Sequence, residues 1–208
     1  TRSSPDYKRF VRALANDIRL QAEAYGNDSP LRSVYAGGGR PTLLSLDLIR
    51  PLLEAAEGFK IQAIKEVTAE VSPADATAKY LEGLAAMGFN RVSISALSFF
   101  DQELNTIGAP HTVFDAKKSI EHARNAGINN ISLDIVFGWP ESTLTNFKET
   151  LEQALALDVP HITLIEWPTA PVDDAGEMER TKQYRHALLY LQEHGFEPYE
   201  ISHFAKPG

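Results

Sequence analysis

The stretch RNAGINNISLDIVFG, residues 124–138, carries the local pattern that decides the fold. Gly127 stands where a helix commonly ends in a left-handed residue, and a run rich in β-branched residues follows it at once. The same arrangement recurs in AAMGFNRVSISALS, residues 85–98, and in QEHGFEPYEISHF, residues 192–204. Each of these units therefore predicts the end of a helix, a glycine that terminates it, and then a strand.

The rest of the chain continues this alternation of helices and strands. Further strands are expected at residues 33–37, 64–72 and 161–167, and helices at about 5–25, 45–57, 74–87, 113–126, 145–157 and 177–194. Strict alternation indicates parallel strands joined by right-handed crossovers. Six strands are too few to close an eight-stranded barrel, so the sequence favours an α/β fold with a partial (β/α)6 barrel of the TIM type over an open doubly wound sheet. We expect residues 1–208 to form a single domain.

The composition excludes several classes of function. The formal net charge of −8 argues against nucleic acid or an anionic membrane surface as a partner. No apolar run approaches the ~18–20 residues that a membrane span needs and no signal peptide opens the chain, so we expect a cytoplasmic protein. The chain has no cysteine, so it cannot by itself ligate an iron–sulfur cluster through thiolates. The histidines are dispersed without an H-x-x-x-H pair, and no metal site is expected.

Candidate functional residues cluster where the expected strands end. Ligands of parallel α/β folds bind at the C-terminal ends of the strands. Period-two alternation places Glu70 and Ser72 on the inner face of strand 64–72 and leaves its apolar residues to face the helices. The acid–base candidates are Glu70, Asp134 and His203, and the ligand-binding candidates are Gly37, Gly38, Gly39, Arg40, Ser72, Ser95, Leu97, Trp139, Ile165 and Trp167. Burial would raise the pKa of a carboxyl group toward the range of a general base.

Each candidate also has a purely structural explanation. Arg40 could clamp an anion, although an ion pair with Glu70 on the neighbouring strand is favoured. Trp139 and Trp167 form either an aromatic wall for a flat ligand or a plug that fills space. The two carboxylates could simply be hydrated in an open cavity, and a lone histidine on a strand is more often structural.

Five motifs at these strand ends carry a family resemblance. They are GGGRPTLLS (37–45), EVSPADA (70–76), SFFDQELNTIGAPHT (98–112), ISLDIVFGWPEST (131–143) and YEISHFAKPG (199–208). In order and spacing they resemble the core of the oxygen-independent coproporphyrinogen III oxidase family, in particular its heme-chaperone (HemW-type) branch within the radical S-adenosylmethionine (SAM) superfamily. The resemblance implies a partial barrel that holds SAM beside a [4Fe–4S] cluster. It also implies that the family's first strand, which the cluster cysteines follow, is missing here.

The resemblance assigns SAM-contacting positions, some of which depart from the family pattern. Glu70 and Asp134 stand where the family has its SAM-contacting carboxylates, and the glycine run stands beside the methionine end of SAM. The departures are Arg40 for a threonine, Ser72 for an asparagine, Leu97 for a SAM-contacting glutamine, Ala109 for an arginine, Trp139 for a leucine, and Ile165-Glu166 for a tyrosine-glutamine pair.

These departures gather at inward strand ends, while the helix and turn signals stay intact. We therefore interpret the chain as an engineered, cluster-free barrel with a rebuilt pocket that binds a flat small molecule or performs cofactor-free acid–base catalysis. No cofactor is expected in this interpretation. The alternatives are a SAM- or heme-binding fragment and an inert folding scaffold. Without the first strand, residues 33–37 form an exposed sheet edge, through which a homodimer is a further expectation.

Overall fold

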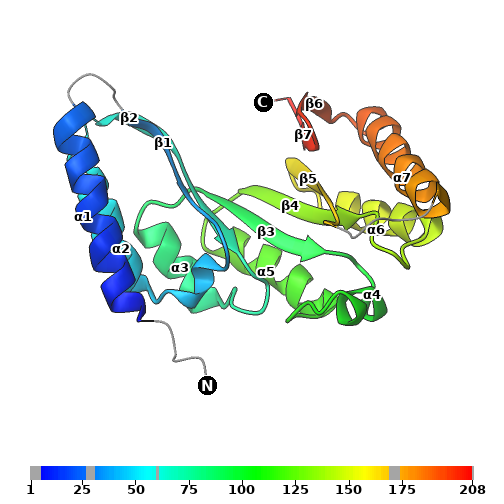
Figure 1. The fold of residues 1–208 in the computed structure, drawn as a ribbon, viewed down its shortest axis with the longest axis horizontal. Helices are drawn as coiled ribbons and strands as arrows, with labels where there is room; N and C mark the ends of the chain where they lie inside the picture. The colour runs from blue at the N-terminus through cyan, green and yellow to red at the C-terminus, as the bar shows by residue number, and fades with distance from the viewer. Residues whose placement is uncertain (1–5, 27–30, 60, 169–173, 208) are drawn as a thin grey trace.

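The computed structural model describes residues 6–26, 31–59, 61–168 and 174–207. Seven strands form one curled sheet, and helices lie along its outer side (Figure 1). The helices are α1 (Tyr7–Tyr25), α2 (Leu46–Ala56), α3 (Ala78–Ala86), α4 (Asp101–Thr106), α5 (Val113–Asn125), α6 (Leu144–Ala156) and α7 (Asp174–Glu193), with a 3-10 turn, η1 (Pro41–Leu43). The strands are β1 (Leu31–Ala36), β2 (Ile61–Val71), β3 (Arg91–Leu97), β4 (Asn130–Phe137), β5 (His161–Glu166), β6 (Glu197–Glu200) and β7 (His203–Ala205).

The order of the strands is that of a partial barrel. Within the sheet they run β1-β2-β3-β4-β5-β7-β6, and β1 to β5 pair in parallel. The α/β class and the partial TIM-type barrel are therefore confirmed. Strand β1 forms one edge of this sheet, as expected, and dimerisation through that edge stays a prediction. Among the described residues, no helix combines the length and apolar character needed to span a bilayer.

The last unit differs from the expected single parallel strand. Residues 197–205 form a hairpin in which β6 and β7 pair with each other, and β7 pairs antiparallel to β5. The reversal occurs at Ile201 and Ser202, and Ser202 has φ of 67°, a left-handed conformation that short polar residues tolerate better than bulky ones. The hairpin turns His203 back alongside Thr163 of β5.

Helix boundaries agree with the sequence pattern except around Pro73. The helix expected from residue 74 begins at Ala78, where the Thr77 hydroxyl accepts a hydrogen bond from the Tyr80 amide. Asp75, which lies before the start of α3, is hydrogen bonded to Arg40 and does not cap the helix. The short helix α4 was not predicted at all.

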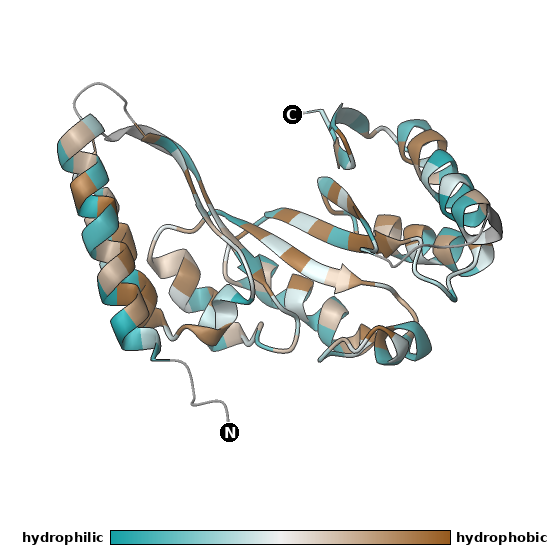
Figure 2. Ribbon diagram, in the orientation of Figure 1, coloured by the Kyte–Doolittle hydropathy of each residue, from teal (hydrophilic) through white to brown (hydrophobic). Residues whose placement is uncertain are grey.

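The hydrophobic core lies between the sheet and the helices, not inside the barrel. Outward residues of β3 and β4 such as Ile94 and Leu133 are fully buried against apolar residues of the helices, among them Leu84 and Ile120. Hydrophobic and hydrophilic positions alternate along these two strands (Figure 2). Since the apolar half of the alternation is used by the core, the other half leaves a polar inner face.

Candidate ligand-binding site

A polar cavity of about 780 Å³ occupies the inner face of the barrel. Its walls come from inward positions of neighbouring strands, which the parallel register brings level with one another. One layer contains Thr68, Arg91 and Asn130, the next Glu70, Ser93, Ser132 and His161, and the third Asp134, Thr163 and His203. We call the part around Glu70 and Asp134 the upper end, next to which Gly38 contacts Glu70 from outside the cavity lining. The part around Arg91, Asn130, His161 and Tyr199 is the lower end.

At the upper end, Glu70 is fixed by the glycine turn that follows β1. Its carboxylate accepts hydrogen bonds from the Tyr35 hydroxyl at 3.0 Å and from the Gly38 amide at 2.8 Å. A Cβ at Gly37 would collide with the Tyr35 ring and come within 2.7 Å of the Glu70 Oε1 atom, so a larger residue there would displace the Tyr35–Glu70 pair. Burial, followed by the bond to Glu70, raises the pKa of Tyr35 to about 12, which keeps its hydroxyl a donor.

The next two glycines of the turn present backbone to open space. Gly38 and Gly39 have φ of 89° and 64°, a region that glycine adopts readily. A Cβ built on either residue would meet no atom within 4 Å. Glycine is favoured at these two positions by the backbone conformation and not by a lack of space, and a ligand can approach the backbone of the turn directly.

Asp134 is the most strongly perturbed acid of the upper end. It is 8% exposed and accepts hydrogen bonds from the hydroxyls of Ser93 at 2.9 Å and Ser95 at 3.3 Å. Burial raises its pKa to about 6; the two serines oppose the shift, and the negative charge of Glu70 adds to it. A carboxyl group with a pKa in this range can exchange protons near neutral pH.

Toward the lower end, a chain of hydrogen bonds links the histidines. His161 bonds the Ser132 hydroxyl through Nδ1 at 2.6 Å and the Tyr199 hydroxyl through Nε2 at 2.7 Å. His203 bonds the Thr163 hydroxyl at 3.2 Å. Burial, and then the proximity of Arg91 and His203, lowers the pKa of His161 to about 4, so this imidazole is neutral at pH 7.

Arg40 corrects one prediction. It forms an ion pair, but with Asp75 rather than with Glu70: Nε and Nη2 donate to the two carboxylate oxygens at 2.6 and 2.8 Å. Burial acts to raise the pKa of Asp75, yet the bonds from Arg40 and from the Thr42 hydroxyl outweigh it, and the pKa lies below its usual value. Glu70 already accepts hydrogen bonds from two other donors. Arg40, which follows the glycine turn, donates to Asp75 instead.

For the two tryptophans the sequence left open an aromatic wall or a plug that fills space. Trp139 is 8% exposed, Trp167 is partly buried, and neither lines the inner cavity. The structure thus favours the space-filling explanation. Of the remaining candidates, Ile165 lines the cavity and the Ser95 hydroxyl donates to Asp134. The Ser72 carbonyl accepts a hydrogen bond from the Asp75 amide in the turn after β2. Leu97 has φ of 66° at a break in the β3–β4 register.

Sequence reasoning missed Arg91, Asn130, His161 and Tyr199 of the lower end, although a signal was present for most of them. Arg91, Ser132 and His161 occupy inward positions near the starts of their strands, in the same period-two pattern that identified Glu70. They were missed because only the C-terminal ends of the strands were considered as ligand-binding positions. Tyr199 gave no such signal, because its position depends on the unpredicted hairpin.

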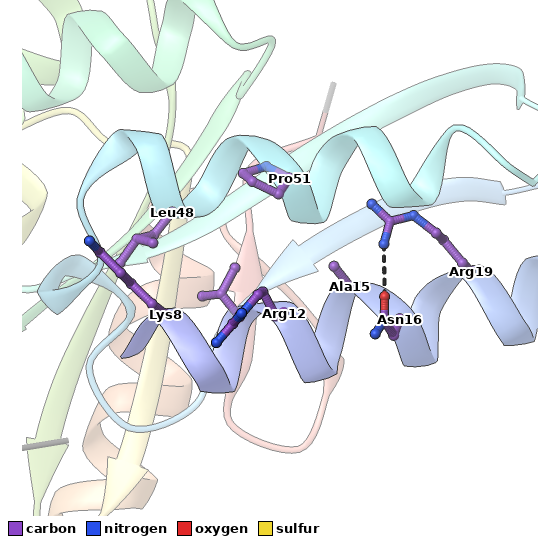
Figure 3. A pocket seen from close by; sticks show the side chains of 8 residues that line it. Lys8, Arg12, Ala15, Asn16, Arg19, Leu48 and Pro51 are labelled. Atoms are coloured by element: carbon purple, nitrogen blue, oxygen red, sulfur yellow. Dashed lines mark hydrogen bonds between the residues drawn. The ribbon is translucent and has the colours of Figure 1, made fainter. Parts of the chain in front are cut away.

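Two further hollows lie around α1. An apolar cavity of about 760 Å³ lies beside β1, lined by α1, α2 and β1 residues that include Phe10, Leu14 and Tyr35. A groove between α1 and α2 carries Lys8, Arg12 and Arg19, and the Arg19 guanidinium donates to the Asn16 side chain at 3.0 Å (Figure 3). Neither hollow brings together the acids and histidines that make the inner cavity the candidate site.

The fold and the polar inner cavity place this chain among the α/β proteins with a TIM-type partial barrel. Comparison with known proteins identifies the family. The family model of the radical SAM superfamily matches residues 2–154, and the chain belongs to that superfamily. It is 32% identical to the heme chaperone HemW of Bacillus subtilis over 213 residues, covering 96% of this chain and 56% of that protein. The heme chaperone HemW of Escherichia coli is 29% identical, covering 96% of this chain and 55% of that protein.

A solved structure supports the fold independently. The coproporphyrinogen III oxidase HemN of Escherichia coli, described as a radical SAM enzyme, superimposes with a TM-score of 0.87 at 23% identity. The superposition covers 100% of this chain and 50% of that one. The chain therefore spans about half the length of the relatives that it matches.

The residues present fit the two cofactors of this superfamily unequally. Thiolates hold [4Fe–4S] clusters, and the 208 residues contain no cysteine, so they do not fit a cluster and no chemical step through one is assigned here. SAM is different, because it carries positive charge and hydroxyl groups. Two carboxylates beside an open glycine turn form a donor and acceptor set that suits such a molecule.

Proposed function

We propose that this chain is a SAM-binding part of a HemW-like radical SAM protein, with the ligand held at the upper end of the inner cavity. The observation that supports it is the joint position of Glu70 and Asp134 on one cavity wall beside the unobstructed Gly38–Gly39 turn. A carboxylate attracts an ammonium or sulfonium group and accepts hydrogen bonds from ribose hydroxyls. The membership of the superfamily and the similarity to HemW proteins point to the same ligand.

The chain's own residues have distinct tasks in this proposal. The turn offers backbone groups to the amino-acid end of the ligand, while Glu70, held by Tyr35 and Gly38, provides fixed negative charge. Bound SAM supplies an activated sulfonium centre. Leu97 and Ala109, which replace a polar glutamine and arginine of the family pattern, remove two potential contacts. We therefore expect binding weaker than in a barrel that keeps both.

Calorimetric titration with SAM tests the proposal. We expect SAM to bind more tightly than S-adenosylhomocysteine, which lacks the sulfonium charge. The substitution Glu70→Gln should weaken SAM binding roughly tenfold or more, since it removes one charge-assisted contact. Glu82→Gln, an exposed acid of α3, is the matched control and should change nothing. Absence of SAM binding, or equal affinity in the Glu70 variant, would contradict the proposal.

A second candidate rests on a different observation, the raised pKa of Asp134. A buried carboxylate with a pKa of about 6 suits cofactor-free proton abstraction from a flat substrate, which is the use that a rebuilt, engineered pocket would serve. The hypothesis of engineering stays a prediction. The test is base-promoted ring opening of 5-nitrobenzisoxazole: the rate should rise through about pH 6 and be lost in Asp134→Asn but not in Glu82→Gln. A rate no faster than that of the buffer would exclude it.

A further inference from the structure

We propose that the lower end of the inner cavity is a separate binding site for a carboxylate group, with the Arg91 guanidinium as its anchor. The site lies on the same cavity wall as Glu70 and Asp134 but nearer the starts of the strands. The inference goes beyond the proposed function and does not depend on it. If the upper end binds SAM as proposed, the lower end would hold the anionic end of a carboxylate-bearing substrate.

Arg91 faces the cavity with its hydrogen-bonding capacity almost unused. Among the described residues its one hydrogen bond is a long one, 3.4 Å, to the Thr68 hydroxyl. No carboxylate of the described part of the chain lies within ion-pair distance of it, although other arginines such as Arg40 are bidentately paired. A guanidinium has five donors, and leaving them unpaired in a partly buried site is unfavourable. Its planar fork matches the two oxygens of a carboxylate.

Two other basic groups near Arg91, His161 and Lys206, are neutral or already paired. His161 is neutral at pH 7, because burial and Arg91 depress its pKa, and both of its ring nitrogens are bonded, to Ser132 and Tyr199. Lys206, which also lines the cavity, forms an ion pair with Asp158 at 2.7 Å. The lower end therefore offers one guanidinium that pairs directly with no carboxylate of the described residues and reaches Glu66 only through the Thr68 hydroxyl.

The charge balance favours a singly charged ligand group over a phosphate. Glu66 lies on the same wall and accepts a hydrogen bond from the Thr68 hydroxyl at 3.0 Å, and Glu70 and Asp134 stand further up. Either anion would face these three acids, but a dianion would meet about twice the repulsion for the same single guanidinium, whereas a carboxylate matches the charge of Arg91 one to one. Arg91 is level with Asn130, four residues before Asp134 along β4, which is ~13 Å at the usual rise per residue. A ligand anchored at Arg91 can thus extend toward the upper end.

Benzoate and benzamide provide a matched pair of probes, because they share shape and differ in charge. By NMR titration we expect benzoate to bind and to shift the imidazole signals of His161, and benzamide to bind at least tenfold more weakly. Arg91→Gln should weaken benzoate binding roughly ten- to hundredfold and leave benzamide unchanged. Arg185→Gln removes the same charge from an exposed position on α7 and should bind benzoate as the wild type does. Phenyl phosphate should not bind more tightly than benzoate.

Several outcomes would overturn the proposal. They are no benzoate binding at millimolar concentration, equal affinity in Arg91→Gln and the wild type, equal loss in the two arginine variants, or a preference for phenyl phosphate. Thermal melting of each variant checks that the barrel is intact. Should Arg91→Gln fail to fold, Arg91→Lys keeps the charge but loses the fork, and its affinity for benzoate should fall while that for benzamide does not; an unchanged affinity would then contradict the proposal. SAM takes no part in these titrations, so their failure and that of the proposed function are distinguishable.

Discussion

Strand β4 has two faces that are equally buried and chemically opposite. Toward the helices, Ile131, Leu133 and Ile135 are fully buried in the apolar core. Toward the cavity, Ser132 and Asp134 are also buried, but each has a hydrogen-bonding partner on a neighbouring strand. Burial by itself therefore does not distinguish a structural position from a chemical one in this barrel. The contacts of each residue distinguish the two kinds of position, because the side chains pack against apolar groups on one face and are hydrogen bonded to polar groups on the other.

The largest expected effect comes from breaking the outer face. Leu133→Ala removes a fully buried side chain from a close-packed core and should lower the free energy of unfolding by about 2–5 kcal/mol. The adjacent substitution Ser132→Ala, at a position of equal burial, removes one hydrogen bond to His161 and should reduce stability by about 1 kcal/mol. Urea denaturation of both variants measures the contrast. Equal losses would show that the two faces do not differ as described.

Substitutions on the inner face should instead change how the free energy of unfolding depends on pH. Because burial raises the pKa of Asp134 to about 6, the folded state holds this proton more tightly than the unfolded state. Its favourable contribution is present below the ordinary pKa near 4 and is lost as the pH rises to about 6. Asp134→Asn should therefore gain stability relative to the wild type by on the order of 1–3 kcal/mol at pH 7 and by little at pH 4.

His161 should produce the opposite slope. Its pKa is lowered to about 4, so its contribution is present above the ordinary pKa of 6.5 and is lost as the pH falls toward 4. His161→Gln should thus compare best with the wild type at low pH and worst at pH 7, with a difference on the order of 2 kcal/mol between the two conditions. Urea denaturation at pH 4.5 and 7 measures both variants. Parallel behaviour of Asp134 and His161 variants would contradict the assigned burial of one of them.

Local signals in the sequence predicted most of the fold. Gly127 ends α5 with φ of 85°, a left-handed conformation that glycine adopts readily, and this requirement is local, so it can be recognised without knowing the tertiary structure. The period-two pattern likewise predicted that Glu70 faces inward. The hairpin of β6 and β7 could not be predicted, because it depends on Ser202 in a left-handed conformation that sequence does not specify for a serine.

Three residues of the predicted site lie together in the structure, but their pairings were not predicted. Glu70, Asp134 and His203 do line one cavity. Which donors they meet depends on register and on loops: Tyr35 reaches Glu70 across β1 and β2, and Tyr199 reaches His161 only after the chain has turned back. Contacts between residues tens of positions apart are set by the packed structure rather than by any local preference.

The smallest expected effect concerns an ion pair at the rim of the barrel. Arg40 and Asp75 are about one-third and one-quarter exposed, and their two short hydrogen bonds fix the glycine turn against the residues after β2. Arg40→Gln should reduce the free energy of unfolding by about 1 kcal/mol, more than the few tenths expected for Lys118→Gln, which breaks an exposed pair with Glu121 on α5. Because Glu70 does not contact Arg40, the pH dependence attributed to the cavity should be unchanged in this variant. Urea denaturation across pH 4.5 to 7 measures the loss, and Asp134→Asn made with and without Arg40→Gln separates the cavity from Asp75, whose own pKa depends on Arg40. A changed effect of Asp134→Asn would mean that the rim and the inner face are coupled.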